Sequence, residues 1–282
     1  MKKTNKIKEL KLIANKLRQD VIRMTAEAGS GHPGGSLGMA DVFAVLYFNY
    51  ARLNQKKPYW EKRDRIVLSN GHICPAQYSA MAELGFFPVK ELMTFRKIDS
   101  KLQGHPHRGS LPGIENSSGP LGQGLSIACG MALARNLDKK KYKIFCLMSD
   151  GEHDEGQTWE AVLFAAKNKL KIIAITDRNG IQISGFTEKI MPLEPLARKY
   201  ESFGWRVFEI DGHNINEVIH ALNEAEKING PVQIICHTVM GKGVSFMENN
   251  YEWHGKAPNK EQAEWALTEL EEWRRRIELE ND

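Results

Sequence analysis

The stretch from residue 143 to residue 185 constrains the fold more than any other part of the chain. Apolar runs at 143–148 and 171–176 are each followed by turn residues, which predicts two buried strands. Between them, residues 157–170 carry apolar side chains at helical spacing. A strand, a helix and a second strand predict two parallel strands joined by a right-handed crossover. We therefore expect an α/β core built on a parallel sheet.

Polar residues follow each of these two strands. Asp150-Gly151 comes directly after the first strand, and Asn179-Gly180 follows the second. Because the carboxyl ends of parallel strands meet at one edge of a sheet, Asp150 and Asn179 should converge there. Carboxylate and amide oxygens suit Mg²⁺, which is often completed by phosphate and water. Either dipeptide alone is an ordinary turn, but the pair across one βαβ unit predicts a magnesium–diphosphate site, with Gly151 allowing close backbone approach.

The rest of the chain continues the alternation of helices and strands. Helices are expected at residues 10–28, 37–50, 125–135, 193–204, 215–228 and 261–280, and strands at 65–69, 206–210 and 232–239. Residues 29–35 contain too much glycine to suggest a helix or a strand, and 103–124 is expected to be a long functional loop. The predicted fold is α/β, with a central, mostly parallel sheet and helices on both faces. We expect one domain over 1–282, with a C-terminal helical tail at about 260–282.

Composition excludes several classes of protein. The chain has 282 residues, 41% of them hydrophobic, which is enough for one large domain or two small ones. Its 39 basic and 35 acidic residues give a formal charge of only +4, so we expect neither a nucleic-acid partner nor a membrane surface. The four cysteines have no CxxC spacing, which favours a reducing, cytoplasmic location. No stretch is long and apolar enough to be a signal peptide or a membrane span.

Four histidines lie in segments that should reach the same edge of the sheet. They are His32, His72, His105 and His254. Each one alone is readily explained as a turn or connector residue. Together, beside a diphosphate, neutral imidazoles suit proton transfer to and from hydroxyl groups, which indicates a polyhydroxylated substrate.

The motifs SGHPGG, SNGH, QGHP, SSGPLGQG and WHG, with the Asp-Gly and Asn elements, resemble transketolase from about residue 10 to about residue 258. The family usually has Gly-Asp-Gly where this chain has Ser149-Asp150-Gly151, which changes the turn but removes no metal ligand. The resemblance implies thiamine diphosphate (ThDP) with Mg²⁺ or another divalent cation. It also implies that the four histidines face the sugar hydroxyls. By resemblance, the metal ligands are Asp150, Asn179 and the backbone carbonyl of Ile181, and the cofactor-binding residues are His72, Gly119, Leu121, Asp150, Gly151, Glu155, Asn179 and Ile183.

The resemblance covers only the first part of a full-length transketolase. A full transketolase continues into a pyrimidine-binding domain, which supplies a glutamate to the cofactor, and into a third domain. The chain is therefore expected to be the N-terminal subunit of a split transketolase. Glu155 matches the family position that contacts the second domain at the subunit interface. The implied partner is a C-terminal transketolase subunit, with two copies of each chain, and the implied reaction moves a two-carbon ketol group between sugar phosphates.

Three alternatives remain open from the sequence. A 2-oxo acid dehydrogenase subunit shares the metal motif but is not expected to carry the GHPGG and GPLGQG loops. A 1-deoxyxylulose-5-phosphate synthase shares more of the pattern but is a single long chain. A non-catalytic ThDP-binding paralogue is disfavoured because all four histidines are present. The donor and acceptor sugars, and the identity of the partner chain, are not predicted by these motifs.

Overall fold

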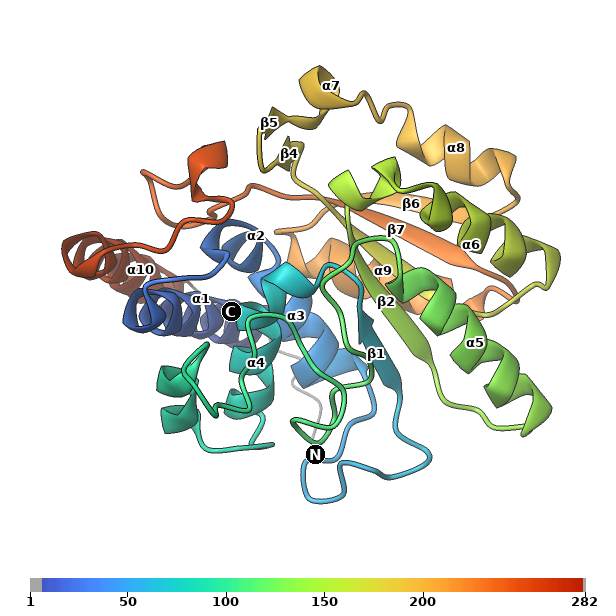
Figure 1. The fold of residues 1–282 in the computed structure, drawn as a ribbon, viewed down its shortest axis with the longest axis horizontal. Coiled ribbons are helices and arrows are strands. Elements are labelled where there is room, and N and C mark those ends of the chain that lie inside the picture. Colours follow the sequence, from blue (N-terminus) through green and yellow to red (C-terminus); the bar gives the residue numbers. More distant parts are fainter. Residues whose placement is uncertain (1–6, 281–282) are drawn as a thin grey trace.

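A five-stranded parallel sheet forms the centre of the protein in a computed structural model, which describes residues 7–280 (Figure 1). Its strands are β1 (Arg65–Leu68), β2 (Ile144–Ser149), β3 (Ile173–Arg178), β6 (Arg206–Asp211) and β7 (Val232–His237), in the spatial order β1-β2-β3-β7-β6. Every neighbouring pair in this sheet is parallel. Residues 1–6 and 281–282, which belong to the predicted domain and its tail, lie outside the described part.

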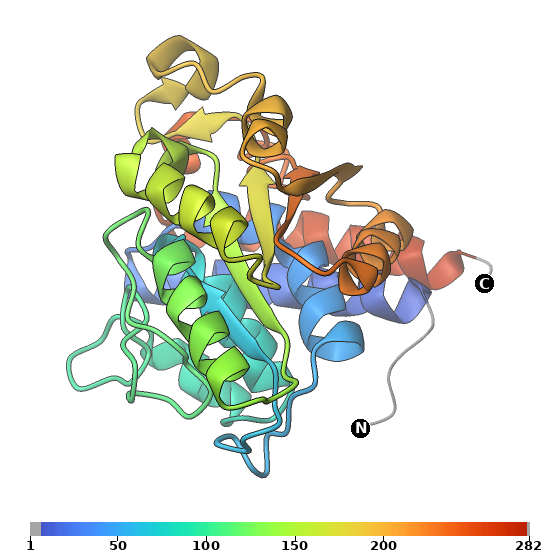
Figure 2. The ribbon, with the colours of Figure 1, turned by 90° about the vertical axis from the view of Figure 1, so that its right-hand side faces the viewer.

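Helices cover both faces of the sheet, as predicted (Figures 1 and 2). Successive residues of β2 alternate between two hydrophobic cores, with Phe145 and Leu147 in one and Cys146 and Met148 in the other. The first core includes residues of α1 (Ile7–Ala28), α3 (Ala40–Val45), α4 (Cys74–Glu83), α9 (Ile215–Lys227) and α10 (Lys260–Leu279). The second includes residues of α5 (Gly124–Leu137), α6 (Gly156–Lys167) and α8 (Leu196–Ser202).

The predicted βαβ unit is present as β2, α6 and β3. Strands β2 and β3 pair in parallel, with Phe145 opposite Ile173 and Ser149 opposite Asp177. Strand β3 continues to Arg178, so it includes two residues that the sequence assigned to the following turn. This register places the residues after Ser149 and after Arg178 at one edge of the sheet.

The glycine-rich segment at 29–35 was wrongly predicted to be outside any helix. Helix α2 (Pro33–Gly38) begins inside it, and Pro33 occupies a position in the first turn, where its missing N–H costs nothing. A Cβ on Gly34 would lie 2.9 Å from the carbonyl oxygen of Trp253, and one on Gly38 would lie 3.0 Å from that of Val239. These glycines therefore allow a short helix to pack closely against the 239–253 loop.

The single helix expected at 37–50 is also divided. Residues there belong to the end of α2, to α3, and to a π-helical turn at Leu46–Tyr50. Other elements not predicted from the sequence are α4, a small hairpin of β4 (Ile181–Gln182) and β5 (Gly185–Phe186), and α7 (Thr187–Ile190). Short 3₁₀ turns lie at Gly71–Ile73, Val89–Thr94, Gly151–Asp154 and Tyr251–Trp253.

The C-terminal helix α10 lies along α1 (Figures 1 and 2). The side-chain amide of Asn15 donates to the carbonyl of Leu270 at 3.0 Å, and the Arg18 guanidinium lies 4.8 Å from the centre of the Trp273 ring. Leu270 is fully buried between the two helices. The C-terminal helix therefore packs on the same core as the N-terminal helix, and the extent of the domain stays a prediction. Among residues 7–280, no helix is long and apolar enough to cross a membrane.

Candidate active site at the carboxyl edge of the sheet

A pocket of about 350 Å³ opens at the carboxyl edge of the sheet. Every site residue predicted from the sequence lines it except Glu155: His32, His72, His105, Gly119, Leu121, Asp150, Gly151, Asn179, Ile181, Ile183 and His254. Four further lining residues were not predicted: Gly35, Ser149, Gln182 and Ser184. Segments that are far apart in the sequence therefore form one concave surface.

Asp150 lies at the point where the ends of β2 and β3 meet. Its side chain is almost completely buried, at 1% exposure. One carboxylate oxygen, Oδ1, accepts the Gly151 N–H at 2.7 Å, whereas Oδ2 accepts the Gly180 N–H at 2.7 Å and the Arg178 guanidinium at 3.0 Å. Burial raises the pKa of Asp150 to about 6, although Arg178 opposes that shift. These bonds fix the carboxylate between the two turns.

The orientation of the Asn179 side chain is set by its neighbours. Its Nδ2 group donates to the buried carboxylate of Asp177 at 2.9 Å, while its Oδ1 atom accepts the Ile181 N–H at 2.9 Å. The Thr238 hydroxyl donates to the other oxygen of Asp177. The amide oxygen of Asn179 is therefore held on the side of Ile181. Asp177 was not identified from the sequence, because residues 177–180 were assigned together to the turn after the strand.

The donors at this edge fit a hard cation. Asp150, Asn179 and Ile181 line the same pocket, and a carboxylate, an amide oxygen and a backbone carbonyl are oxygen donors that suit Mg²⁺. Within residues 7–280 no group of three or more His, Cys, Asp or Glu residues could hold a metal. A metal site here would therefore depend on the amide and backbone oxygens as well as on Asp150.

Arg178 is a second feature that sequence analysis missed. Besides Asp150, its guanidinium donates to the Thr187 hydroxyl at 2.9 Å and to the carboxylates of Glu188 at 2.8 Å and Glu194 at 2.9 Å. Arg178 thus connects the Asp150 carboxylate to the segment that follows the β4–β5 hairpin. The only sequence signal for it was a charged residue between Asp177 and Asn179.

The four histidines form a compact cluster on one wall of the pocket. The ring centre of His32 lies 5.5 Å from that of His72, 6.0 Å from His105 and 5.7 Å from His254, and His72 lies 5.2 Å from His254. Burial, followed by the nearby His254 and Arg96, lowers the pKa of His32 to about 4. Burial also lowers the pKa of His72 well below its usual value, and those of His105 and His254 to a lesser extent. The cluster is therefore neutral at neutral pH.

Two predicted residues mark the outer rim of the site. Ile183 lines the pocket but is 73% exposed, because it lies at the tip of the β4–β5 hairpin. Glu155 is exposed and lies outside the pocket lining. It packs beside the loop that carries Leu121, since a Cβ on Gly122 would lie 2.9 Å from the Cβ of Glu155. Its cofactor and interface roles stay predictions.

The beginning of α5 depends on a close approach between backbone segments. A Cβ on Gly124 would lie 2.4 Å from the Cβ of Ser69, which directly follows β1. The Gly124 N–H also donates to the Ser69 hydroxyl at 3.0 Å. This contact joins the loop carrying Leu121 to the segment carrying His72, so glycine at 124 helps to assemble the pocket.

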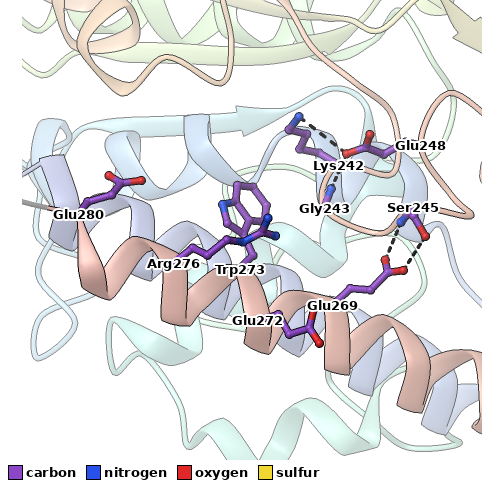
Figure 3. A pocket seen from close by; sticks show the side chains of 9 residues that line it. All are labelled: Lys242, Gly243, Ser245, Glu248, Glu269, Glu272, Trp273, Arg276 and Glu280. Carbon is purple, nitrogen blue, oxygen red and sulfur yellow. Dashed lines mark hydrogen bonds and ion pairs between the residues drawn. The ribbon is translucent and has the colours of Figure 1, made fainter.

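A larger cavity lies elsewhere, between α10 and the loop at 242–248 (Figure 3). Its volume is about 530 Å³. Two of its carboxylates, those of Glu269 and Glu248, accept hydrogen bonds from the 242–248 loop. Glu269 accepts both the N–H and the hydroxyl of Ser245, at 2.7 and 2.5 Å, and Glu248 accepts the Gly243 N–H at 2.9 Å (Figure 3). None of the site residues predicted from the sequence lines this cavity.

Comparisons with curated proteins find several relatives of nearly the same length. The chain is 42% identical to a 6-deoxy-6-sulfo-D-fructose transketolase subunit of a Clostridium species, over 92% of this chain and 94% of that protein. It is 39% identical to an apulose-4-phosphate transketolase subunit of Phocaeicola vulgatus, over 98% of this chain and 99% of that protein. Human transketolase is 38% identical over 94% of this chain but only 42% of its own length.

Solved structures give the same result for the fold. Transketolase from Campylobacter jejuni superimposes with a TM-score of 0.88 and 36% identity, covering 94% of this chain and 43% of that chain. The protein therefore spans less than half the length of these single-chain transketolases. Residues 9–273 match the family described as the transketolase, thiamine diphosphate binding domain. The predicted transketolase resemblance is thus confirmed, and the chain belongs to the family of the transketolase thiamine diphosphate-binding domain.

Proposed function

We propose that this protein is the N-terminal subunit of a split, ThDP- and Mg²⁺-dependent transketolase. In this reaction a two-carbon ketol group passes from a ketose phosphate to an aldose phosphate. The observation that carries the proposal is the carboxyl-edge pocket, in which oxygen donors and four neutral histidines face the same space. A ligand with a diphosphate at one end and a hydroxylated substrate beyond it would use both groups.

The residues divide into two roles. Asp150, Asn179 and the carbonyl of Ile181 would hold the cation, and Gly151 would leave room for the diphosphate. Leu121 and Ile183 would contact the cofactor rings, with Gly119 beside them. When bound, ThDP supplies the nucleophilic carbon and the electron sink of the reaction. These assignments rest on the donor chemistry and on the shared pocket.

The histidine cluster would act on the substrate. Neutral imidazoles both donate and accept hydrogen bonds, so His32, His72, His105 and His254 can orient sugar hydroxyls and move protons between them. His72 belongs to the 3₁₀ turn that follows β1, and from there it would reach the cofactor. The Nδ1 atom of His32 is buried without a hydrogen-bond partner in the described structure, and a substrate hydroxyl would satisfy it.

A second chain would complete the active site. The Clostridium and Phocaeicola relatives are both named as transketolase subunits, and they align over nearly their whole length with this chain. We infer that the partner is a C-terminal transketolase subunit, with two copies of each chain in the assembly. The exposed side chains of Ile183 and Glu155 at the pocket rim would contact it.

The protein is proposed to work in the cytoplasm. Its four cysteines, Cys74, Cys129, Cys146 and Cys236, are buried and free, which suits a reducing compartment.

The proposal is tested by reconstitution. The chain is purified, saturated with Mg²⁺ and ThDP, and assayed for transfer from a ketose phosphate to an aldose phosphate, with and without the candidate C-terminal subunit. We expect turnover only in the mixture. Rapid turnover by the chain alone would contradict the split-enzyme assignment, and no turnover by any mixture, with cofactor bound, would favour a non-catalytic role.

A further inference from the structure

A second concave, charged surface lies at the amino edge of the sheet, opposite the candidate active site. A pocket of about 280 Å³ there is bordered by Ile144 and Ile173, the first residues of β2 and β3. These strands are six residues long, which corresponds to roughly 20 Å. The amino-edge pocket is therefore separate from the pocket that holds Asp150 and the histidines.

Basic side chains dominate the lining of the amino-edge pocket. They are Arg135, Lys140, Lys141, Lys143 and Lys171, accompanied by one carboxylate, that of Glu226. These residues come from the end of α5, from the segment before β2, from the segment before β3, and from α9. The parallel sheet thus collects positive charge that is dispersed along the sequence.

Among these residues, Arg135 gives the strongest indication of an anion site. It is only 6% exposed, yet its guanidinium donates to neutral acceptors, the carbonyl of Lys171 at 2.9 Å and the side-chain oxygen of Asn136 at 3.0 and 3.2 Å. No carboxylate pairs with it among residues 7–280. Because a buried charge is costly unless a counter-charge accompanies it, this site favours an anion.

The neighbouring lysines add to this positive charge. Lys171 donates to the backbone carbonyl of Glu226 at 2.6 Å, and the nearby Glu226 carboxylate offsets part of its charge. Lys141 is exposed and has no ion pair in the described part of the chain. Lys143 pairs with Glu226 at 3.0 Å, and Lys140 lies 3.4 Å from Glu61 and 3.6 Å from Asp138. Among residues 7–280, the cations of Arg135 and Lys141 therefore have no carboxylate partner, and Glu226 is shared between Lys143 and Lys171.

We propose that the amino-edge pocket binds a compact phosphate dianion, either free phosphate or the phosphate group of a small metabolite. Arginine and lysine cations are the usual protein environment of phosphate oxygens. The Arg135 N–H groups already donate to Asn136, Tyr142 and Lys171, so Arg135 would act mainly through its charge, and Lys141 would contact the ligand directly. The pocket's small volume limits the ligand to a compact one. An extended polyanion such as a nucleic acid would instead require a continuous basic surface.

The test uses the full chain with Mg²⁺ and ThDP at saturation, so that the carboxyl-edge site is occupied. Binding of labelled inorganic phosphate is measured by equilibrium dialysis for the wild type, for Lys141→Glu and for Lys139→Glu. Both lysines are exposed, but only Lys141 lines the pocket. We expect Lys141→Glu to weaken binding about tenfold and Lys139→Glu to leave it nearly unchanged.

Two outcomes would overturn the proposal. One is the absence of phosphate binding by the wild type, and the other is an equal loss in both variants, which would show only a general effect of charge. Competition with ribose 5-phosphate then distinguishes the two sources of the ligand. Displacement at lower concentration than unlabelled phosphate assigns the pocket to a phosphorylated metabolite, whereas weaker displacement assigns it to free phosphate. Arg135→Gln is the second variant, and it should also weaken phosphate binding.

Discussion

The two cavities at the carboxyl edge and on α10 differ in how their polar groups are satisfied. The α10 cavity is the larger, at about 530 Å³ against about 350 Å³, but Glu269 and Glu248 there are fully engaged by Ser245, Gly243 and Lys242 (Figure 3). At the carboxyl edge, four histidines are held neutral by burial, and the Nδ1 atom of His32 has no partner within the described residues.

The difference shows that volume is a poor guide to function in this protein. A cavity whose carboxylates accept hydrogen bonds from its own walls contributes to packing and stability, whereas a cavity with a buried, unpartnered polar atom is organised for a ligand. Substitutions in the two cavities should therefore have different consequences for binding and turnover. Changes at the carboxyl edge should alter binding or turnover, and changes near α10 should alter neither.

The largest expected effect is on turnover. In the reconstituted complex, His105→Ala and His254→Ala should each lower kcat by about 100-fold or more, because each removes a group that handles substrate protons. The affinity for Mg²⁺-ThDP should stay within about twofold, since neither side chain is expected to hold the diphosphate. Steady-state kinetics and a cofactor titration on the same preparations separate these effects. Glu269→Ala, in the α10 cavity, is the control and should turn over normally.

The next effect is on cofactor affinity. Asp150→Ala removes one of the proposed oxygen ligands and leaves the cation less compensated, so the Kd for Mg²⁺-ThDP should rise at least about tenfold. Isothermal titration calorimetry on the reconstituted complex measures it. Glu248→Ala, at the α10 cavity, is the matched control. It also removes one carboxylate, but it should leave the Kd unchanged. Equal affinities for the wild type and Asp150→Ala would remove the metal assignment.

A third effect is on packing at the rim of the site. Gly124→Ala should lower the free energy of unfolding by about 1–3 kcal/mol, because the new Cβ would meet Ser69 at 2.4 Å. Gly130 lies in the same helix, and a Cβ added there would have nothing within 4 Å, so Gly130→Ala should stabilise the chain by about 0.5–1 kcal/mol. Chemical denaturation of both variants gives the comparison, and similar values would exclude the close approach at Gly124.

A fourth effect is on the pH dependence of stability. The pKa of His32 is lowered to about 4 in the folded protein, so between its ordinary value near 6.5 and about 4 the unfolded chain binds a proton that the folded chain does not. The contribution of the neutral, buried His32 to the free energy of unfolding is therefore complete above pH 6.5, and it declines as the pH falls through this window. His32→Gln should therefore show a shallower loss of unfolding free energy from pH 6.5 to pH 4. Parallel slopes for the two proteins would argue against a neutral, buried His32.

Local patterns were sufficient to predict the βαβ unit and the convergence of Asp150 and Asn179, whereas several other lining residues came from the family resemblance and four were not predicted. The apolar runs before Asp150 and Asn179 specify strands, and parallel pairing then brings their ends together. The glycines at 29–35 misled the prediction, because glycine in a helix is rare unless another backbone lies close by, and that neighbour, the 239–253 loop, is distant in the sequence.

The features that sequence analysis missed depend on long-range contacts. Asp177 orients Asn179, and Arg178 reaches Asp150 and two glutamates, through distances that only the folded chain defines. The amino-edge pocket was missed for the same reason. Its cations at Arg135, Lys141 and Lys171 are separated in the sequence and read as ordinary surface charge.

The most direct measurement is a crystal structure of the protein grown with Mg²⁺ and excess ThDP. We expect density for the diphosphate at the carboxyl edge, beside Gly151, with a cation between it and the oxygens of Asp150, Asn179 and Ile181. The space beside the four clustered histidines should stay free for the substrate. Cofactor density in the α10 cavity, or a diphosphate bound without contact to Asp150 and Asn179, would contradict the proposed site.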